Sequence, residues 1–421
     1  MAMSDSEKQP TSSELDVGVL VPLSDPVKAA ISKSFWGHDP ALLQTTQRLH
    51  SSGSKSRINL DPYFAYYTKQ CRHALHDGGR HVATRTHADI VSCADMLKTN
   101  MTRREIRDAI AVRSKLGSKS PRHPNASEMI DSSIDLSASL LLMTNFGSCS
   151  YGFSGKARLS WESEPEPESE PELRPQYAQA PPPRHQSSLR DFLEAYFAPD
   201  PPSHASSLSS STVTETVKLE KIFKASNLCR IAGLRIVWTD NLADHLRLSD
   251  DDTRVHIFHH ASFLQAQSPD PQACLFPVGL VEETLKTLAL LFPSSDAETK
   301  TWLDGLPALG STTGADGEDG EIDKRVTHCG RLKTDDRRID RFRYWRDRLI
   351  MLKQVFDEAQ PKTIQQWWYD SRNGVQWYTF WVAVLVLVLT IVFGLIQSIE
   401  GALQVYASFR EAPHGGNGDK G

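Results

Sequence analysis

Three histidines in the segment RVHIFHHASF are the side chains best placed to do chemistry: His256, His259 and His260. Imidazole nitrogens are common ligands of zinc and other transition metals, and acidic residues 250–252 come just before them. The spacing matches neither the helical pair of a zincin nor a compact structural zinc site. Alternate side chains of a strand also point to opposite faces, which favours a packing or interaction role over metal binding. The three histidines are therefore kept as the candidate metal ligands, and no metal is assigned to them.

A second group, Asp240, Asp244 and His245, could supply an acid and a base. The same residues first indicate a helix cap followed by an exposed helix face. The chain contains no GxSxG or Walker GK[ST] motif. Its six cysteines form no CxxC pair. The sequence therefore predicts no catalytic residue and no cofactor, and it favours a non-enzymatic role.

The composition of the chain is that of ordinary globular material, with 39% hydrophobic and 24% charged residues among 421. A net charge of -5 gives no reason to expect nucleic acid as a partner.

The segment 377–399, WYTFWVAVLVLVLTIVFGLIQSI, contains no charged residue. As a helix it would reach about 34 Å at ~1.5 Å per residue, against a hydrocarbon core of about 30 Å. The sequence therefore predicts a single-pass membrane protein whose partner is the lipid bilayer. Aromatic residues on the upstream side are expected to form the interfacial belt: Trp367, Trp368, Trp377, Tyr378 and Trp381.

Small and polar residues follow one face of the distal half of this span. They are Thr390, Gly394, Gln397, Ser398, Gly401 and Gln404. Small residues let two helix backbones approach, and an amide in hydrocarbon favours a partner across an interface. The stripe predicts self-association through the span. A simple decline of hydrophobicity toward the far interface would give the same composition.

The expected fold class is mixed α+β and mainly helical, with cytosolic helical and small α/β domains, a long charged helix and one C-terminal transmembrane helix. The predicted parts are a disordered N-terminus (1–13), a helical domain (14–150), a Glu/Pro-rich linker (151–188), a small α/β domain (189–306), a flexible loop (307–334), an amphipathic charged helix (335–360), a juxtamembrane aromatic segment (361–376), the span (377–399) and a short tail (400–421).

Local signals support several elements of this division. Thr102 and Glu105 make a capping box ahead of a helix. Residues 231–238 and 254–258 have the composition of strands, and 280–292 has the periodicity of a helix packed on a small sheet. In the charged helix, Phe342, Trp345, Leu349, Leu352 and Phe356 recur at spacings of three and four. That seam is expected to pack on the chain's own domain, with a short coiled coil as the alternative.

Five segments of the chain carry a resemblance to known proteins: WRDRLIMLKQVFDEAQP, QQWWYDSRNGVQWYTFW, FGLIQSIEGALQVY, IFHHASFL and GLVEETLKTLALLFP. They resemble a family of uncharacterised single-pass membrane proteins of filamentous ascomycete fungi. The similarity covers most of the chain outside the linkers and is densest over 341–406. It implies a fungal membrane protein, and the family has no assigned activity to carry over. The long Glu-Pro run is not part of the family pattern.

The order of parts is also similar to that of CorA-type magnesium channels, which place a soluble α/β domain and a long charged helix before the membrane. Those channels carry a Gly-Met-Asn signature and a second span, and this sequence has neither. An oligomeric ion channel of this kind remains an alternative, as does a membrane-tethered metal-dependent enzyme.

The N-terminal part is expected to be cytosolic, because the apolar run 17–23 is too short and proline-broken for a signal peptide. Basic residues between 331 and 353 upstream of the span agree with this orientation. The expected host membrane is the endoplasmic reticulum or the plasma membrane. The sequence therefore predicts a membrane-anchored interaction or scaffold module that self-associates through its span.

Overall fold

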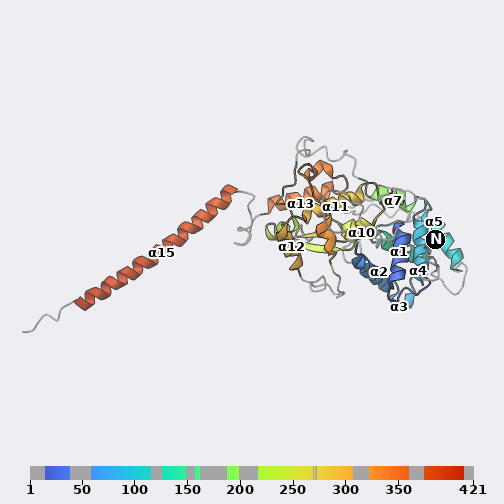
Figure 1. The fold of residues 1–421 in the computed structure, drawn as a ribbon, viewed down its shortest axis with the longest axis horizontal. Helices are drawn as coiled ribbons and strands as arrows, with labels where there is room; N and C mark the ends of the chain where they lie inside the picture. The colour runs from blue at the N-terminus through green and yellow to red at the C-terminus, as the bar shows by residue number, and fades with distance from the viewer. Residues whose placement is uncertain are drawn as a thin grey trace, which may run out of the picture. The chain divides into compact units, whose positions relative to one another are not determined.

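The computed structural model describes residues 15–37, 58–114, 126–147, 157–161, 187–198, 217–268, 270, 273–306, 322–359 and 374–411 (Figure 1). The chain divides into two units. The first comprises Met1–Cys229 and Gly233–Glu358, and the second comprises Arg230–Ala232 and Ala359–Gly421. The segments expected to form separate helical and α/β domains thus belong to one unit. The fold is mixed and mostly helical, with one small sheet.

The N-terminal helices pack around α6 (Ala126–Leu142), most of whose residues are buried. The others are α1 (Asp25–Trp36), α2 (Asp61–Ala74), α3 (His76–Gly79), α4 (His87–Leu97) and α5 (Arg103–Arg113). Helices α2, α4 and α5 contact α6, and α1 contacts α4. Small serine side chains in α6 let the neighbouring helices approach it closely. The Ser137 hydroxyl donates to the Ser133 carbonyl of the same helix at 2.9 Å, so it can be buried without a partner from another helix.

Side-chain caps fix where these helices begin. The predicted box of Thr102 and Glu105 is confirmed at the start of α5, and Thr86 and Asp89 make a second box at the start of α4. Each box satisfies two backbone N–H groups that a helix start leaves without a partner.

The sheet has three strands in the order β1-β3-β2. Strand β1 (Arg235–Thr239) pairs in parallel with β3 (Arg254–Phe258), and β2 (Leu248–Ser249) pairs antiparallel with β3. The prediction for 254–258 is confirmed at both ends. The other predicted strand began too early, because helix α9 (Ala225–Arg230) occupies its approach and Gly233, at φ 71°, turns the chain before β1.

Short helices complete this part of the unit. They are α7 (Leu189–Tyr196), α10 (Ala261–Ala266), α11 (Leu280–Leu291) and α12 (Ala297–Asp304), with 3-10 helices η2 (Leu242–Asp244) and η4 (Lys324–His328). The helix predicted over 280–292 is confirmed to within one residue as α11.

Aromatic side chains join the helical segment to the α/β segment. The ring of Phe263 on α10 stacks on that of Tyr63 with centroids 5.7 Å apart, and it meets the edge of Trp36 at 6.1 Å. All three side chains are buried. Because this contact gives both segments one shared core, neither has to stabilise itself alone.

The charged helix predicted from 335 begins only at Arg346, as α13 (Arg346–Glu358). Before it lie two 3-10 turns, η5 (Asp335–Arg337) and η6 (Ile339–Arg341). Backbone bonds explain the correction: the Leu219 amide donates to the Arg337 carbonyl at 2.8 Å, and the Ile339 amide donates to the Val217 carbonyl at 3.1 Å. Groups used in this bridge cannot also serve a helix.

The start of α13 is held by a glutamate from α11. The carboxylate of Glu283 accepts bonds from the backbone amides of Arg343, Tyr344 and Trp345 at 2.7, 2.7 and 2.8 Å. Burial raises the pKa of Glu283, and these three bonds oppose that rise. The apolar seam of α13 is buried in its own unit, as predicted, with Leu349, Leu352 and Phe356 as its buried residues.

Part of the expected Glu/Pro-rich linker is packed. Leu159 and Trp161 are buried, and Leu159 forms a backbone bridge with Phe146. Residues 162–186 lie outside the described residues. The fold therefore includes residues 157–161, which the low-complexity composition further on had obscured.

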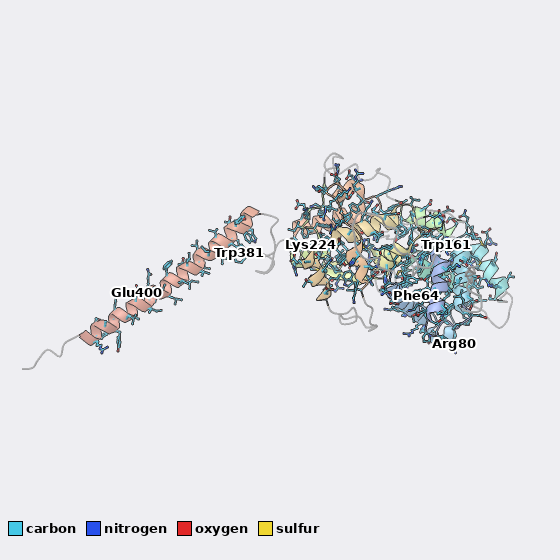
Figure 2. All side chains as sticks on the ribbon, in the orientation of Figure 1. Phe64, Arg80, Trp161, Lys224, Trp381 and Glu400 are labelled. Atoms are coloured by element: carbon cyan, nitrogen blue, oxygen red, sulfur yellow. The ribbon has the colours of Figure 1, made fainter. Side chains whose placement is uncertain are left out.

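The second unit contains α15 (Gly374–Glu411), a helix of 38 residues. It continues past Ile399, so the predicted tail begins within the helix. Within α15, the segment Trp377–Arg410 is long and apolar enough to cross a membrane, and an 18-residue window of it has a mean hydropathy of 2.8. Figure 2 shows side chains extending outward from α15 over the whole helix, with Trp381 and Glu400 labelled.

Candidate polar site at the carboxyl edge of the parallel strands

Polar side chains meet where the two parallel strands end. Asp240 directly follows β1, and His259 and His260 directly follow β3. The register pairs Thr239 with Phe258, so the residues that follow them leave the sheet side by side. The carboxyl edge of parallel strands is where α/β proteins commonly place ligand sites.

The three side chains converge on one carboxylate oxygen. Asp240 Oδ1 accepts a hydrogen bond from His260 Nε2 at 2.7 Å and lies 3.2 Å from His259 Nε2. The two imidazole rings stack with centroids 4.0 Å apart. Both histidines are 2% exposed, whereas the Asp240 side chain is 35% exposed. The site is thus closed on the histidine side and open at the carboxylate.

A neighbouring acid, Asp323, supports the same site from the position just before η4. The Asp323 amide donates to His259 Nδ1 at 3.3 Å, and its carboxylate accepts from the Ser262 amide at 2.6 Å. Since His259 Nδ1 faces an N–H donor, it acts as an acceptor, and the proton of the neutral ring belongs on Nε2. The hydrogen-bond pattern therefore assigns the tautomer of His259.

The charges of the site follow from burial and these contacts. Burial by itself raises the pKa of Asp240, but the adjoining His259 and His260 side chains outweigh it and hold that pKa well below its ordinary value. Burial, followed by the nearby His259, lowers the pKa of His260. At neutral pH the site therefore holds a carboxylate anion beside a neutral His260.

The donor set can hold a metal ion. One oxygen of Asp240 and one nitrogen from each histidine all lie within 4.8 Å of one another. His259 Nε2 and His260 Nδ1 are buried without a hydrogen-bond partner. Two imidazoles and a carboxylate form a recurrent ligand set for zinc and ferrous iron.

The structure does not bring His256 into this cluster. Its Nε2 lies 2.9 Å from the Ser249 hydroxyl on β2, and its side chain is half-buried. This agrees with the alternation of side chains along β3. The residues of the acidic turn before β3, Asp250, Asp251 and Asp252, all adopt positive φ and shape the β2–β3 connection.

The acid and base group Asp240, Asp244 and His245 is likewise divided. Asp244 is fully buried and accepts from the Asn241 amide group at 2.8 Å. His245 Nε2 lies 2.7 Å from the Thr287 hydroxyl on α11. Their contacts are those of a packed interior rather than of a site open to a substrate.

Sequence reasoning placed Asp240 in a different group from His259 and His260, and it did not select Asp323. Asp240 could have been joined to the histidines, because it occupies the position after one strand that they occupy after the other. That inference needs the parallel pairing of β1 and β3, which the sequence does not state. Asp323 lies more than 60 residues from the histidines in the chain and carries no local signal.

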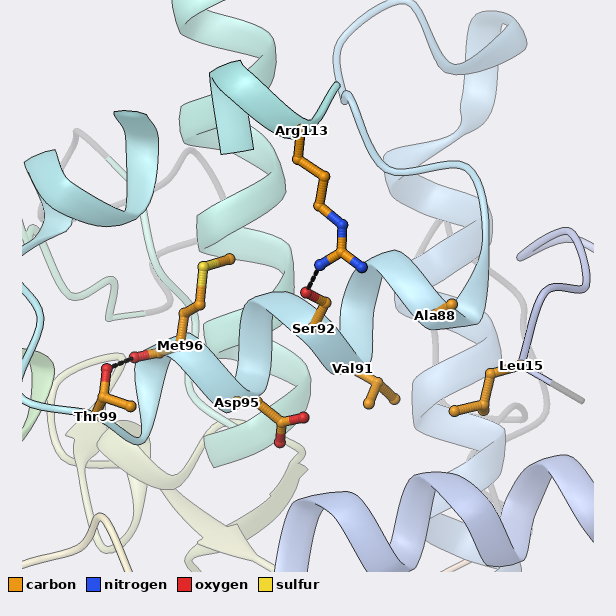
Figure 3. A pocket seen from close by; sticks show the side chains of 8 residues that line it. All are labelled: Leu15, Ala88, Val91, Ser92, Asp95, Met96, Thr99 and Arg113. Atoms are coloured by element: carbon orange, nitrogen blue, oxygen red, sulfur yellow. Dashed lines mark hydrogen bonds between the residues drawn. The ribbon is translucent and has the colours of Figure 1, made fainter. Parts of the chain in front are cut away.

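A surface hollow of about 490 Å³ lies beside α4 (Figure 3). It is lined by Leu15, Ala88, Val91, Ser92, Asp95, Met96, Thr99 and Arg113. The Arg113 guanidinium reaches across it to the Ser92 hydroxyl. None of its lining residues belongs to the polar site.

The predicted residues of the apolar helix lie partly within the described chain. Trp377, Tyr378 and Trp381 form a run of aromatic contacts, with Trp377 meeting the edge of Tyr378 at 5.1 Å. Trp367 and Trp368 lie outside the described residues. The Thr390 hydroxyl donates to the Val386 carbonyl at 2.8 Å. The Ser398 hydroxyl likewise donates to the Gly394 carbonyl at 2.9 Å.

No family model, no curated protein and no solved structure matches the chain. The function is therefore argued from the geometry of the chain.

Proposed function

We propose that this protein is a single-pass membrane-anchored interaction module that self-associates through α15. Its first unit acts as a non-enzymatic binding or scaffold domain in the cytosol, at the endoplasmic reticulum or the plasma membrane. The observation that carries the proposal is the apolar surface of α15.

That surface is too large to stay in water. Twelve large apolar side chains between Val382 and Ile399 are exposed. Removing each from water contributes roughly 1.5–3 kcal/mol, so covering all of them is worth roughly 20–35 kcal/mol. A bilayer offers this burial, and the absence of charge from 377–399 fits its hydrocarbon core.

The interior of the first unit supports a binding role over catalysis. Two arginines of α5 pair with aspartates of α6: Arg103 Nη1 lies 2.6 Å from Asp135 Oδ1, and Arg107 Nη2 lies 2.9 Å from Asp131 Oδ1. Arg103 also lies over the ring of Trp161 at 5.6 Å. Both arginines lie on α5, and their charges are directed into the fold.

Orientation can be tested with glycosylation. Asn100 begins an Asn-Met-Thr sequon and is exposed just before α5. A second natural sequon begins at Asn125, and replacing Asp419→Thr creates a third at Asn417, beyond α15. With the first unit in the cytosol, only the variant gains a glycan in cells, at Asn417. Glycan on Asn100 would invert the orientation.

Self-association rests on the stripe around Gly394 and Gly401. A Cβ added at either glycine meets nothing within 4 Å, so both positions are open to a second helix. The hydroxyls of Thr390 and Ser398 are already satisfied within α15, so a polar contact between helices would come from the amide of Gln397.

The test is cross-linking of the full chain in native membranes. Gly394→Ile and Gly401→Ile should lower the dimer yield severalfold, because each inserts a branched side chain where backbones must approach. Ala407→Ile is the matched control, since it adds similar bulk about 140° around the helix from Gly394. Equal dimer yield in all three variants and the unmodified chain would refute self-association through this stripe.

A further inference from the structure

We propose that Asp240, His259 and His260 form a binding site for a divalent transition-metal ion of the zinc class. The site goes beyond the membrane-anchored module proposed above and differs from the trio selected on sequence, because Asp240 takes the place of His256. Its ligands come from the ends of two strands that the parallel pairing places together.

The separations of the ligand atoms are close to those of a metal centre. Around a tetrahedral zinc ion with ligands at ~2.1 Å, neighbouring ligand atoms are about 3.4 Å apart. His259 Nε2 and Asp240 Oδ1 are already 3.2 Å apart. His260 Nε2 lies 2.7 Å from the same oxygen, so this pair has to open by roughly 0.7 Å. Asp240 can make that movement, since its side chain is partly exposed.

The alignment of one nitrogen supports the same assignment. His259 Nε2 is buried and lies 3.2 Å from Asp240 Oδ1 without forming a well-aligned hydrogen bond. A buried polar atom whose hydrogen bond is poorly formed costs up to roughly 1–3 kcal/mol. A metal ion between His259 and Asp240 would satisfy this nitrogen and replace the contact between Asp240 and His260 with two ligand bonds.

The surrounding residues set the cost of binding. Ligation through His259 Nε2 leaves the ring proton on Nδ1, where it would oppose the Asp323 amide. The bond given up is 3.3 Å long, whereas the Asp323 carboxylate holds the Ser262 amide at 2.6 Å and the Arg325 amide at 2.9 Å. Metal binding therefore sacrifices the longest of these contacts and changes the tautomer of His259.

The donor types select the metal. Magnesium and calcium prefer sites made of oxygen, whereas two imidazoles and one carboxylate suit zinc or ferrous iron. Three protein ligands leave a fourth position of a tetrahedral ion open. It would lie on the side of Asp240, where the site meets solvent, and would take a water molecule.

The test uses the full chain in detergent, stripped with a chelator, loaded with zinc chloride and passed through a desalting column. The unmodified chain should retain one zinc ion, and Asp240→Ala should retain at most a tenth as much. His256→Gln is the matched control, because it removes a neighbouring imidazole outside the cluster, and it should retain zinc fully. Equal retention by the unmodified chain and a folded Asp240→Ala would overturn the proposal, as would no retention by the unmodified chain.

A second measurement does not depend on Asp240→Ala. Nitrogen NMR of histidine-labelled full chain should show His259 protonated on Nε2 in the stripped protein and on Nδ1 after zinc is added, and the His259 signal is the one that His259→Gln removes. Zinc retained without this tautomer change would place the ion elsewhere, and the proposed site would be wrong.

Discussion

His245 should make the stability of the first unit strongly dependent on pH. Its side chain is fully buried, and both ring nitrogens are used in the neutral form: Nδ1 accepts from the Phe258 amide at 3.2 Å, and Nε2–H donates to the Thr287 hydroxyl at 2.7 Å. That hydroxyl donates onward to the Thr284 carbonyl at 2.6 Å. A second proton on the ring would face the Phe258 N–H with no acceptor.

The magnitude follows from the pKa shift. Burial, followed by the charge of Arg348, lowers the pKa of His245 from 6.5 to about 3. Because the folded state has the lower pKa, its stability is complete above pH 6.5 and is lost as the pH falls toward 3. At ~1.36 kcal/mol per pH unit, the loss from this histidine is about 2 kcal/mol at pH 5 and about 5 kcal/mol in total.

The assay is urea unfolding of the full chain in detergent between pH 7.5 and 5, followed by pulse proteolysis of the first unit. His245→Asn keeps an acceptor for the Phe258 amide but cannot take up a proton. It should be less stable at pH 7.5, and its stability should fall less steeply with acid, by up to about 1.4 kcal/mol per pH unit. His256→Gln, at a half-buried position, should retain the steep slope.

Parallel stability curves for the unmodified chain and His245→Asn below pH 6.5 would refute this reasoning. A direct NMR titration of the imidazole with a midpoint near 6.5 would refute it equally, whatever the variant does.

Three further substitutions probe particular contacts of the first unit, each measured as the free energy of unfolding. Glu283→Ala should lower the free energy of unfolding by about 3 kcal/mol or more, because it leaves three backbone amides at the start of α13 without an acceptor. Glu282→Ala, at the exposed neighbouring position, should change it by less than about 0.5 kcal/mol. Equal losses in the two variants would show that Glu283 does not hold α13. Arg103→Met should cost about 3 kcal/mol, since it leaves a half-buried aspartate of α6 without its cation, and a loss below about 1 kcal/mol would contradict this. Gly279→Ala should cost about 1–2 kcal/mol, because its φ of 90° strains any side chain, and unchanged stability would contradict the positive φ.

Local patterns predicted the elements that depend on neighbouring residues. The capping box of Thr102 and Glu105, the strand 254–258 and the helix at 280–292 were all confirmed, because alternation, caps and helical periodicity act within a few residues. The apolar run at 377–399 likewise predicted α15, since its length and lack of charge need no tertiary information.

Local sequence patterns could not predict which distant segments of the chain pair with each other. The charged helix began late because residues 337–339 bond to 217–219, more than 100 positions away in the chain. The two expected domains became one unit because Phe263 packs on Trp36 and Tyr63, and nothing local to any of these aromatic residues specifies its partner.

The sequence by itself determined where the apolar helix lies and singled out three histidines as candidate ligands. Only the tertiary structure decided that His259 and His260 face Asp240 while His256 faces Ser249. The physical reason is the parallel register of β1 and β3: it brings the residues after the two strands to one edge, and the alternation along β3 leaves His256 outside the cluster.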